Sequence, residues 1–295
     1  MRKNARVTST RPEAPAPAHR TRLIATDLDG TLLRDDKSVS PRTVAALAAA
    51  EEAGVEVFFV TGRPARWMDV VSDHVHGHGL AICGNGAAVV DLHGDAGSHS
   101  FVKIRAIERE VATEVVELLR AAAPGTAFAV ERTTGIHHEL AYPPLHLDPA
   151  VTIAPAEKLL AEDSELADHP VLKLLAHHSE LSPDAFLALA RTAIGGAANV
   201  TRSSPTALLE ISAAGVSKAS TLALCCAERG ITPDEVVAFG DMPNDVEMLS
   251  WAGTSYAMGN AHPDVVAAAS GRTVANNDDG VAVIIEQILA DRLAS

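Results

Sequence analysis

The stretch Leu23-Ile24-Ala25-Thr26-Asp27-Leu28-Asp29-Gly30-Thr31-Leu32 decides how the chain folds. Its apolar start, Leu23–Ala25, predicts a buried strand. Because side chains alternate along a strand, Asp27 and Asp29 point the same way while Leu28 turns back towards packing. Two carboxylates aimed at one point repel each other and are costly to bury unpaired, so we expect a cation, a substrate or both between them. Gly30 permits the turn that follows.

Three further segments place polar side chains where a predicted strand ends or a helix begins. Open α/β sheets form their ligand crevices beyond the carboxyl ends of parallel strands, so we expect these segments to meet the first one at a single edge of a sheet. Together they form a candidate phosphate-handling site. The segments are Thr61-Gly62-Arg63, Gly215-Val216-Ser217-Lys218 and Gly240-Asp241-Met242-Pro243-Asn244-Asp245.

The order of the predicted elements indicates an α/β protein with an insertion. Strands and helices alternate at both ends of the chain, which is typical of a parallel sheet with helices on its faces. Between them the pattern changes to hairpins and isolated helices, which predicts an inserted α+β unit. The alternating strands are 23–25, 55–60, 80–83, 236–239 and 255–258, with helices 41–53, 65–71, 218–228, 245–251, 263–268 and 280–289. The insertion has strands 88–91, 101–104, 127–130, 137–140, 172–177, 200–202 and 207–211, with helices 107–122, 156–160 and 183–194.

Composition excludes several classes of partner. The chain has 295 residues, 47% of them hydrophobic, and a formal net charge of −14. This charge argues against nucleic acid, whose phosphates are held by clustered Lys and Arg. No apolar run approaches the roughly 20 residues needed to span a bilayer, so we expect no membrane partner. An anionic substrate then needs local basic groups or a bound cation.

The cysteines and residues 1–20 indicate the cellular compartment of the protein. Cys83, Cys225 and Cys226 form no C-x-x-C pair, and adjacent cysteines rarely meet disulfide geometry. They are interpreted as small buried side chains in a reducing cytoplasm. Residues 1–20 are basic and rich in Pro and Ala without the apolar stretch of a signal peptide, so a disordered leader is expected there.

The four ordered segments resemble the motifs of the haloacid dehalogenase-like superfamily. Further segments resemble its Cof-type branch of phosphatases, and the resemblance spans about residues 21 to 290. It implies a Rossmann-like parallel core, residues 21–87 and 212–295, with an α+β cap, residues 88–211, inserted between the second and third motifs. The Cof-type segments are Asn85-Gly86-Ala87, Gly259-Asn260-Ala261 and Asp279-Gly280-Val281-Ala282.

The resemblance also implies roles for the acidic residues. Asp27 is the expected nucleophile, forming an aspartyl-phosphate, and Asp29 the expected general acid and base. The carboxylates of Asp27 and Asp241, with the backbone carbonyl of Asp29, are expected to hold Mg²⁺, which prefers oxygen ligands. Asp245 is expected behind these ligands or as a cap of the following helix.

The remaining motif residues are expected to bind phosphate. Thr61 offers a hydroxyl, Gly62 a backbone N–H, and Lys218 a cation that donates as charge shifts in the transition state, which makes it a catalytic residue. Arg63 either contacts the substrate or pairs with an acidic neighbour. Asn244 either donates to a phosphate oxygen or holds Lys218 in place.

Two other groups of residues leave alternatives open. Asn85-Gly86 is interpreted as a tight turn into the cap in preference to a catalytic element. The histidines His74, His76, His78, the pair at 137–138 and the pair at 177–178 are interpreted as solvated loop residues in preference to a zinc site. Alternatively, His137, His138 and Tyr142 line the substrate pocket.

The sequence therefore predicts a Mg²⁺-dependent phosphatase of small phosphomonoesters, with a cap that closes over the site. A sugar phosphate is the first candidate substrate, and a phosphorylated cofactor such as a flavin or pyridoxal phosphate is the second. One alternative is a phosphosugar mutase that uses the same intermediate. Another is a non-catalytic protein that binds a metabolite or has a regulatory role.

Overall fold

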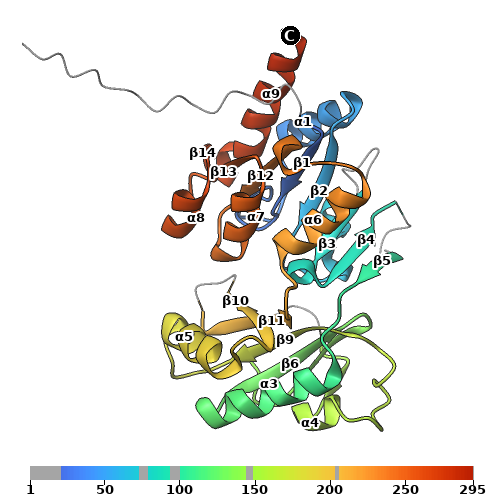
Figure 1. The fold of residues 1–295 in the computed structure, drawn as a ribbon, viewed down its shortest axis with the longest axis vertical. Coiled ribbons are helices and arrows are strands. Elements are labelled where there is room, and N and C mark those ends of the chain that lie inside the picture. Colours follow the sequence, from blue (N-terminus) through green and yellow to red (C-terminus); the bar gives the residue numbers. More distant parts are fainter. Residues whose placement is uncertain (1–20, 73–78, 94–99, 144–148, 203–205, 295) are drawn as a thin grey trace, which may run out of the picture.

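A computed structural model describes residues 21–72, 79–93, 100–143, 149–202 and 206–294 (Figure 1). The leader expected at residues 1–20 lies outside this range, as do His74, His76 and His78. Among the described residues, no helix combines the length and the apolar character needed to cross a bilayer.

The upper part of the molecule in Figure 1 is built on an eight-stranded sheet in the order β14-β13-β12-β1-β2-β3-β4-β5. The first strand of the chain, β1, lies in its middle and pairs in parallel with β12 and β2. This confirms the Rossmann-like α/β core expected from the alternating elements. The parallel strands are β1 (Leu23–Thr26), β2 (Glu56–Val60), β3 (Leu80–Cys83), β12 (Val236–Gly240), β13 (Thr254–Ala257) and β14 (Gly271–Arg272).

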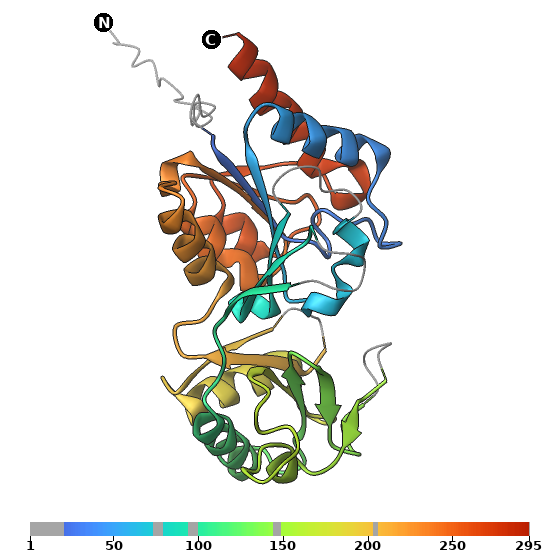
Figure 2. The same ribbon diagram turned by 90° about the vertical axis from the view of Figure 1, so that its right-hand side faces the viewer.

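Helices cover both faces of this sheet (Figure 2). Alternate strand residues divide between two apolar clusters: Ile24 and Phe59 pack with the helices α1 and α9, whereas Ala25 and Phe58 pack with α6, α7 and α8. The strands are therefore buried on both sides, as their continuous apolar runs predict. The helices are α1 (Pro41–Glu52), α6 (Lys218–Glu228), α7 (Val246–Trp251), α8 (Pro263–Ala268) and α9 (Gly280–Leu293), with the short α2 (Asp69–Ser72) before β3.

The inserted unit, the cap, contains a second sheet of six strands in the order β10-β11-β9-β6-β7-β8. Three helices pack on one face of this sheet, and its other face is turned towards the core (Figure 1). The cap helices are α3 (Arg109–Ala122), α4 (Ala156–Leu159) and α5 (Pro183–Ile194). Its strands are β6 (Ala127–Arg132), β7 (Gly135–His138), β8 (Thr152–Ile153), β9 (Val171–His177), β10 (Ala198–Thr201) and β11 (Leu208–Ala213).

The hairpin at the expected start of the cap belongs instead to the core sheet. Strand β4 (Ala88–Asp91) pairs antiparallel with β3, and β5 (Ser100–Ile104) pairs with β4 at the edge of the eight-stranded sheet. The boundary expected at residue 88 is therefore wrong: the chain enters the cap sheet only near Ile107, which bridges to Val171. The physical reason is the tight turn after β3, which returns the chain alongside that strand.

Candidate active site

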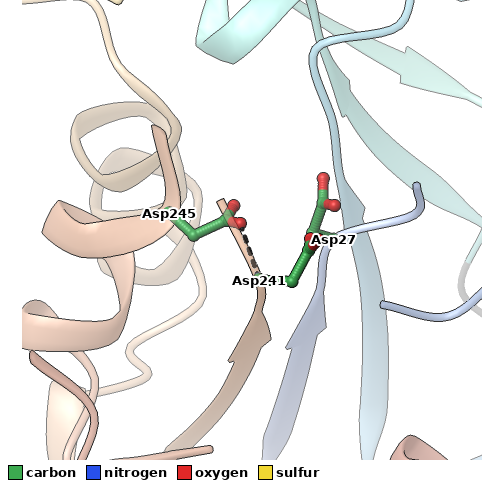
Figure 3. Close-up of side chains that lie close together, drawn as sticks. All are labelled: Asp27, Asp241 and Asp245. Atoms are coloured by element: carbon green, nitrogen blue, oxygen red, sulfur yellow. Dashed lines mark hydrogen bonds between the residues drawn. The ribbon is translucent and has the colours of Figure 1, made fainter. Parts of the chain in front are cut away.

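The motif residues meet at the carboxyl ends of the core strands, on the edge that faces the cap. Asp27 follows β1 and Asp241 follows β12, while Asp245 lies on the turn before α7 (Figure 3). One carboxylate oxygen from each of the three lies within 4.8 Å of the others, and all three residues are buried. Among the described residues, this is the only acidic, His or Cys group spaced to hold a metal ion.

A buried lysine neutralises part of this cluster. Lys218, the first residue of α6, donates from Nζ to Asp27 Oδ1 at 2.5 Å and to Asp245 Oδ1 at 2.7 Å. Burial by itself lowers the pKa of Lys218, but the two carboxylates outweigh it and leave the pKa raised, so the lysine is a fixed cation. Ser217 caps the helix and begins it at this residue.

Asp245 is hydrogen-bonded through both of its carboxylate oxygens. Its Oδ2 accepts the backbone N–H of Asp241 at 3.0 Å (Figure 3). The same oxygen accepts the backbone N–H of Met242 at 3.0 Å, while Oδ1 accepts from Lys218. Both oxygens of Asp245 are therefore engaged in holding the cluster together. The oxygens best placed for a cation are those of Asp27 and Asp241.

The environment of Asp27 and Asp241 fits a divalent cation. Burial, assisted by the charge of Asp245, raises the pKa of Asp241 to about 7. Burial also raises the pKa of Asp27 well above its ordinary value, although Lys218 opposes this shift. Two buried carboxyls that resist ionisation need positive charge between them, and an all-oxygen donor set suits Mg²⁺.

Gly30 makes room for this arrangement. Its φ is +78°, and a Cβ at this position would overlap the Asp241 carboxylate. The hydroxyl of Thr31 donates to Asp241 Oδ1 at 3.1 Å, on the same side. The turn after β1 therefore contacts the end of β12 directly. This close contact requires glycine at position 30, because any side chain there would overlap Asp241.

Asp29 lies apart from the buried cluster and is paired with two cations. Arg63 donates to its two oxygens at 2.6 and 2.7 Å, and Lys37 donates to Oδ1 at 2.8 Å. Partial burial raises the pKa of Asp29, but these hydrogen bonds and charges outweigh burial and lower the pKa to about 2. Of the two alternatives for Arg63, the structure shows the pairing with an acidic neighbour.

The predicted phosphate-binding residues surround the same point. The Thr61 hydroxyl accepts the N–H of Arg63 at 3.1 Å, which closes the turn around Gly62. Asn244 donates from Nδ2 to Asn85 Oδ1 at 3.1 Å. It therefore holds the turn after β3 and makes no hydrogen bond to Lys218 among the described residues.

A cavity of about 350 Å³ lies between this edge and the cap sheet. The core side contributes Asp27, Asp29, the turn at residues 61–64 and Trp67. The cap side contributes residues that sequence reasoning missed: Glu131, Lys173, Leu175, Leu208 and Glu210. A usable signal existed, because a charged residue in the middle of an apolar strand is rarely buried without a partner.

Polar contacts join the cap to the core across this cavity. Arg66, on the core side, pairs with Glu131 of β6, with Nη2 donating to Oε2 at 3.2 Å. Lys173 of β9, which pairs with Glu210 of β11 within the cap at 2.7 Å, donates to the Gly62 carbonyl of the core at 2.9 Å. The cap sheet therefore presents charged side chains to the site in addition to Leu175 and Leu208.

The described histidines form no metal site and do not line the cavity. His137 is fully buried, so the expectation of a solvated loop residue is wrong for it. Burial lowers its pKa to about 4, which keeps the ring neutral. The rings of His138 and Tyr142 lie with their centroids 5.6 Å apart, tilted by 36°, and Tyr142 is buried in the cap. The alternative in which these residues line the pocket is not met.

Comparisons with known proteins agree with the motif assignment. The sequence profile of the haloacid dehalogenase-like hydrolases matches residues 24–285. The pyridoxal phosphate phosphatase YbhA of Escherichia coli is 30% identical over 277 residues, covering 90% of this chain and 97% of that protein. The 5-amino-6-(5-phospho-D-ribitylamino)uracil phosphatase YitU of Bacillus subtilis is 27% identical over 275 residues, covering 90% and 96%.

A solved structure has a similar fold over nearly the whole chain. BT1666 of Bacteroides thetaiotaomicron, a phosphatase of the HAD superfamily, superposes with a TM-score of 0.75 at 25% identity, covering 94% of this chain and 98% of that one. The profile match includes all four motifs and the cap between them. The chain therefore belongs to the haloacid dehalogenase-like hydrolases, and it is a Cof-type phosphatase that hydrolyses phosphoric monoesters.

Proposed function

We propose that the protein is a Mg²⁺-dependent phosphatase of small phosphomonoesters, working through an aspartyl-phosphate on Asp27. The observation that supports this most is the position of the Asp27 carboxylate. It is buried, hydrogen-bonded to the fixed cation Lys218 and close to Asp241. A carboxylate held in this way is oriented for attack and has one side engaged by a cation.

In the first step, one Asp27 oxygen attacks phosphorus and the bond from phosphorus to the ester oxygen breaks. Asp29 gives its proton to the departing alkoxide. In the second step, Asp29 takes a proton from a water molecule, which attacks the phosphorus of the aspartyl-phosphate and releases inorganic phosphate and Asp27. General acid–base catalysis of this kind is worth roughly 10²–10⁴-fold.

Asp29 must first lose part of the pairing with Arg63 and Lys37 that holds it ionised. Arg63 is the residue that can release it, because a dianionic phosphoryl group offers the guanidinium a stronger partner than Asp29 does. Substrate binding then draws Arg63 towards the phosphoryl oxygens. The pKa of Asp29 rises as this partner leaves, which allows Asp29 to carry the proton that the leaving group needs.

The remaining charge on the phosphoryl group is balanced by the core. Lys218, the Thr61 hydroxyl and the Gly62 N–H are proposed to donate to its oxygens in the transition state. Asp27, Asp241 and the Asp29 carbonyl would hold Mg²⁺, which supplies a positive charge that offsets the repulsion between carboxylate and phosphate. Asn244 is proposed to orient the turn after β3 through its hydrogen bond to Asn85.

The substrate is proposed to be a small phosphorylated metabolite. A cavity of about 350 Å³ accommodates one ring or a short sugar, and Trp67, Leu175 and Leu208 give it apolar walls. The relatives named for pyridoxal phosphate and for a phosphoribitylamino-uracil both act on a phosphate attached to a ring-bearing compound. A ring-bearing phosphomonoester is therefore as good a candidate as a sugar phosphate.

Phosphate release tests the proposal. The panel is sugar phosphates, flavin mononucleotide, pyridoxal phosphate and p-nitrophenyl phosphate, each measured with Mg²⁺ and with EDTA. We expect release that requires Mg²⁺ and that falls to background in a folded Asp27→Asn variant, because the amide is a poor nucleophile. Folding is checked by circular dichroism. Transfer of phosphate between positions of a sugar bisphosphate without release would favour the mutase, and no turnover of any compound would contradict the proposal.

A further inference from the structure

Two charged residues of the cap are buried against the core. Lys173 lies in the middle of β9 and Glu210 in the middle of β11, and their side chains are 7% and 6% exposed. They pair at 2.7 Å. A buried ion pair repays its loss of hydration only when further hydrogen bonds satisfy the remaining atoms, so the other partners of these two residues are informative.

Both residues find their other described partners in the core. Lys173 Nζ donates to the carbonyl oxygen of Gly62 at 2.9 Å. Glu210 Oε2 accepts from Asn85 Nδ2 at 2.6 Å, and Asn85 Oδ1 accepts from Asn244. We call these four side chains the cap–core bridge: Lys173, Glu210, Asn85 and Asn244.

The cap–core bridge packs directly on the phosphate-binding turn. A Cβ on Gly62 would lie 3.2 Å from Asn85 Oδ1 and 3.4 Å from Glu210 Oε2. The Asn85 N–H also donates to the Thr61 carbonyl at 3.0 Å. The backbone on both sides of the Gly62 N–H is therefore held by groups of the bridge.

The conformation of Asn85 depends on these contacts. Its φ is +56°, a region that a residue with a side chain adopts at a cost and keeps when its surroundings fix it. Neighbouring Gly86, at φ +103°, packs against the Ser217 carbonyl, and its own carbonyl accepts from Thr221 of α6. The turn after β3 thus joins the Gly62 turn to the start of the helix that carries Lys218.

We propose that Glu210 and Lys173 are positioning residues for phosphoryl transfer. With the cap seated on the core, they fix Gly62, Asn85 and Asn244 in the geometry that binds the transferring phosphoryl group. They act on the phosphoryl group through the core, whatever the leaving group is. The inference rests on the proposed phosphatase function and adds to it a requirement for cap residues that do not select the substrate.

The test is Glu210→Gln, which keeps the shape of the side chain and removes the charge that Lys173 needs. We expect kcat/KM for p-nitrophenyl phosphate, glycerol phosphate and pyridoxal phosphate to fall by the same factor, on the order of 10- to 100-fold. Orthovanadate resembles the transition state, so its inhibition constant should rise by a similar factor. A merely structural role would lower the active fraction and leave that inhibition constant unchanged.

A second variant acts from the core end of the bridge. Asn85→Gly removes the amide while glycine readily adopts the same φ. It should reproduce the loss, and the double variant should lose little more than either single one, because the two residues act as a unit. This variant also carries the test if Glu210→Gln does not fold.

The matched control is Glu139→Gln. Glu139 is also a buried carboxylate of the cap, accepting from the N–H groups of Phe128 and Ala156, but it does not line the cavity. It should lower the melting temperature and leave kcat/KM and vanadate inhibition unchanged.

Two results would overturn the inference. One is an unchanged vanadate inhibition constant in both Glu210→Gln and Asn85→Gly. The other is a loss that differs strongly between leaving groups, because that would make Glu210 a substrate contact. If the wild-type protein releases no phosphate from any compound, the proposed function fails first. If the wild-type protein is active and the variants that lack the bridge are equally active, this inference alone is contradicted.

Discussion

Gly30 has no side chain and therefore leaves room for the Asp241 carboxylate. Its φ of +78° and its contact with the Asp241 carboxylate leave no space for a methyl group. In Gly30→Ala, the methyl group must displace Asp241, so we expect Mg²⁺ affinity to fall by about 10-fold or more. Isothermal titration calorimetry measures this directly.

Gly54 provides a matched control for this substitution. Its φ is +76°, nearly the same as that of Gly30, but a Cβ there would meet no atom within 4 Å. Gly54→Ala therefore carries a similar backbone cost, about 1 kcal/mol, without a clash. Equal losses of Mg²⁺ affinity in the two variants would show that backbone strain, and not the contact with Asp241, is responsible.

Asp241 makes the stability of the metal-free protein depend on pH. Its pKa is raised from an ordinary value of 3.8 to about 7, chiefly by burial. The folded state therefore binds this proton more tightly than the unfolded state, and stability falls as the pH rises from about 4 to about 7. Mg²⁺ binds the ionised form, so its stabilising effect grows over the same range.

Thermal melting with EDTA and with Mg²⁺, at about pH 5 and about pH 8, measures this linkage. The gain in melting temperature on adding Mg²⁺ should be larger at the higher pH. Asp241→Asn removes the titrating group and should flatten both trends. A gain that is equal at the two pH values would contradict the link between Asp241 and the metal.

Local patterns predicted most of the elements. Helices α5 and α8 begin at Pro183 and Pro263, as expected, because each proline follows a residue whose side chain caps the helix. The strand β1 and its acidic end were also predicted, since the apolar run stops where the two carboxylates begin. These are features that neighbours in the sequence determine.

Strand partners were harder to predict. The run at β4 has the apolar character of a strand in either sheet, and only the turn at Asn85 and Gly86 decides that it returns along β3. That turn has positive φ at three successive residues, Gly84, Asn85 and Gly86, and glycine and asparagine adopt positive φ more readily than other residues. The hairpin of β4 and β5 could therefore be predicted from the sequence, but the sheet to which the hairpin belongs could not.

The candidate site was predicted in its core half and missed in its cap half. The core residues directly follow the ends of predicted strands. A residue just beyond the carboxyl end of a parallel strand lies at the edge of the sheet where ligands bind, so its position in the sequence is enough to place it. Lys173 and Glu210 lie in the middle of cap strands, and their contacts with Gly62 and Asn85 join residues more than a hundred positions apart. Such contacts depend on how the two sheets face each other, which no local pattern encodes.

The two sheets of the molecule have different roles in the site: the core sheet carries its carboxylates, and the cap sheet faces them. The strand ends of the core sheet carry the carboxylates, the start of α6 carries Lys218, and one face of the cap sheet is turned towards them (Figure 1). Because the cavity lies between the two, any movement of the cap changes both its volume and the contacts of the Gly62 turn. Cap closure would therefore exclude water and organise the core in one motion.

The net charge of the whole molecule opposes its substrate. A formal charge of −14 repels a phosphate dianion before the local cations of the site can act. Added salt screens this repulsion over a length of about 8 Å at physiological ionic strength. We therefore expect kcat/KM for p-nitrophenyl phosphate to rise about two- to threefold as NaCl increases from about 20 to about 200 mM at saturating Mg²⁺.

The turnover number at saturating substrate serves as the internal control, because encounter no longer limits it. It should change little over the same range of salt, so that the effect lies in capture of the substrate. A fall in kcat/KM with salt would instead mean that the field at the cavity mouth is positive. Lys173, Arg63 and Lys218 would then outweigh the acidic surface, and the cavity would attract phosphate from a distance as well as bind it on contact.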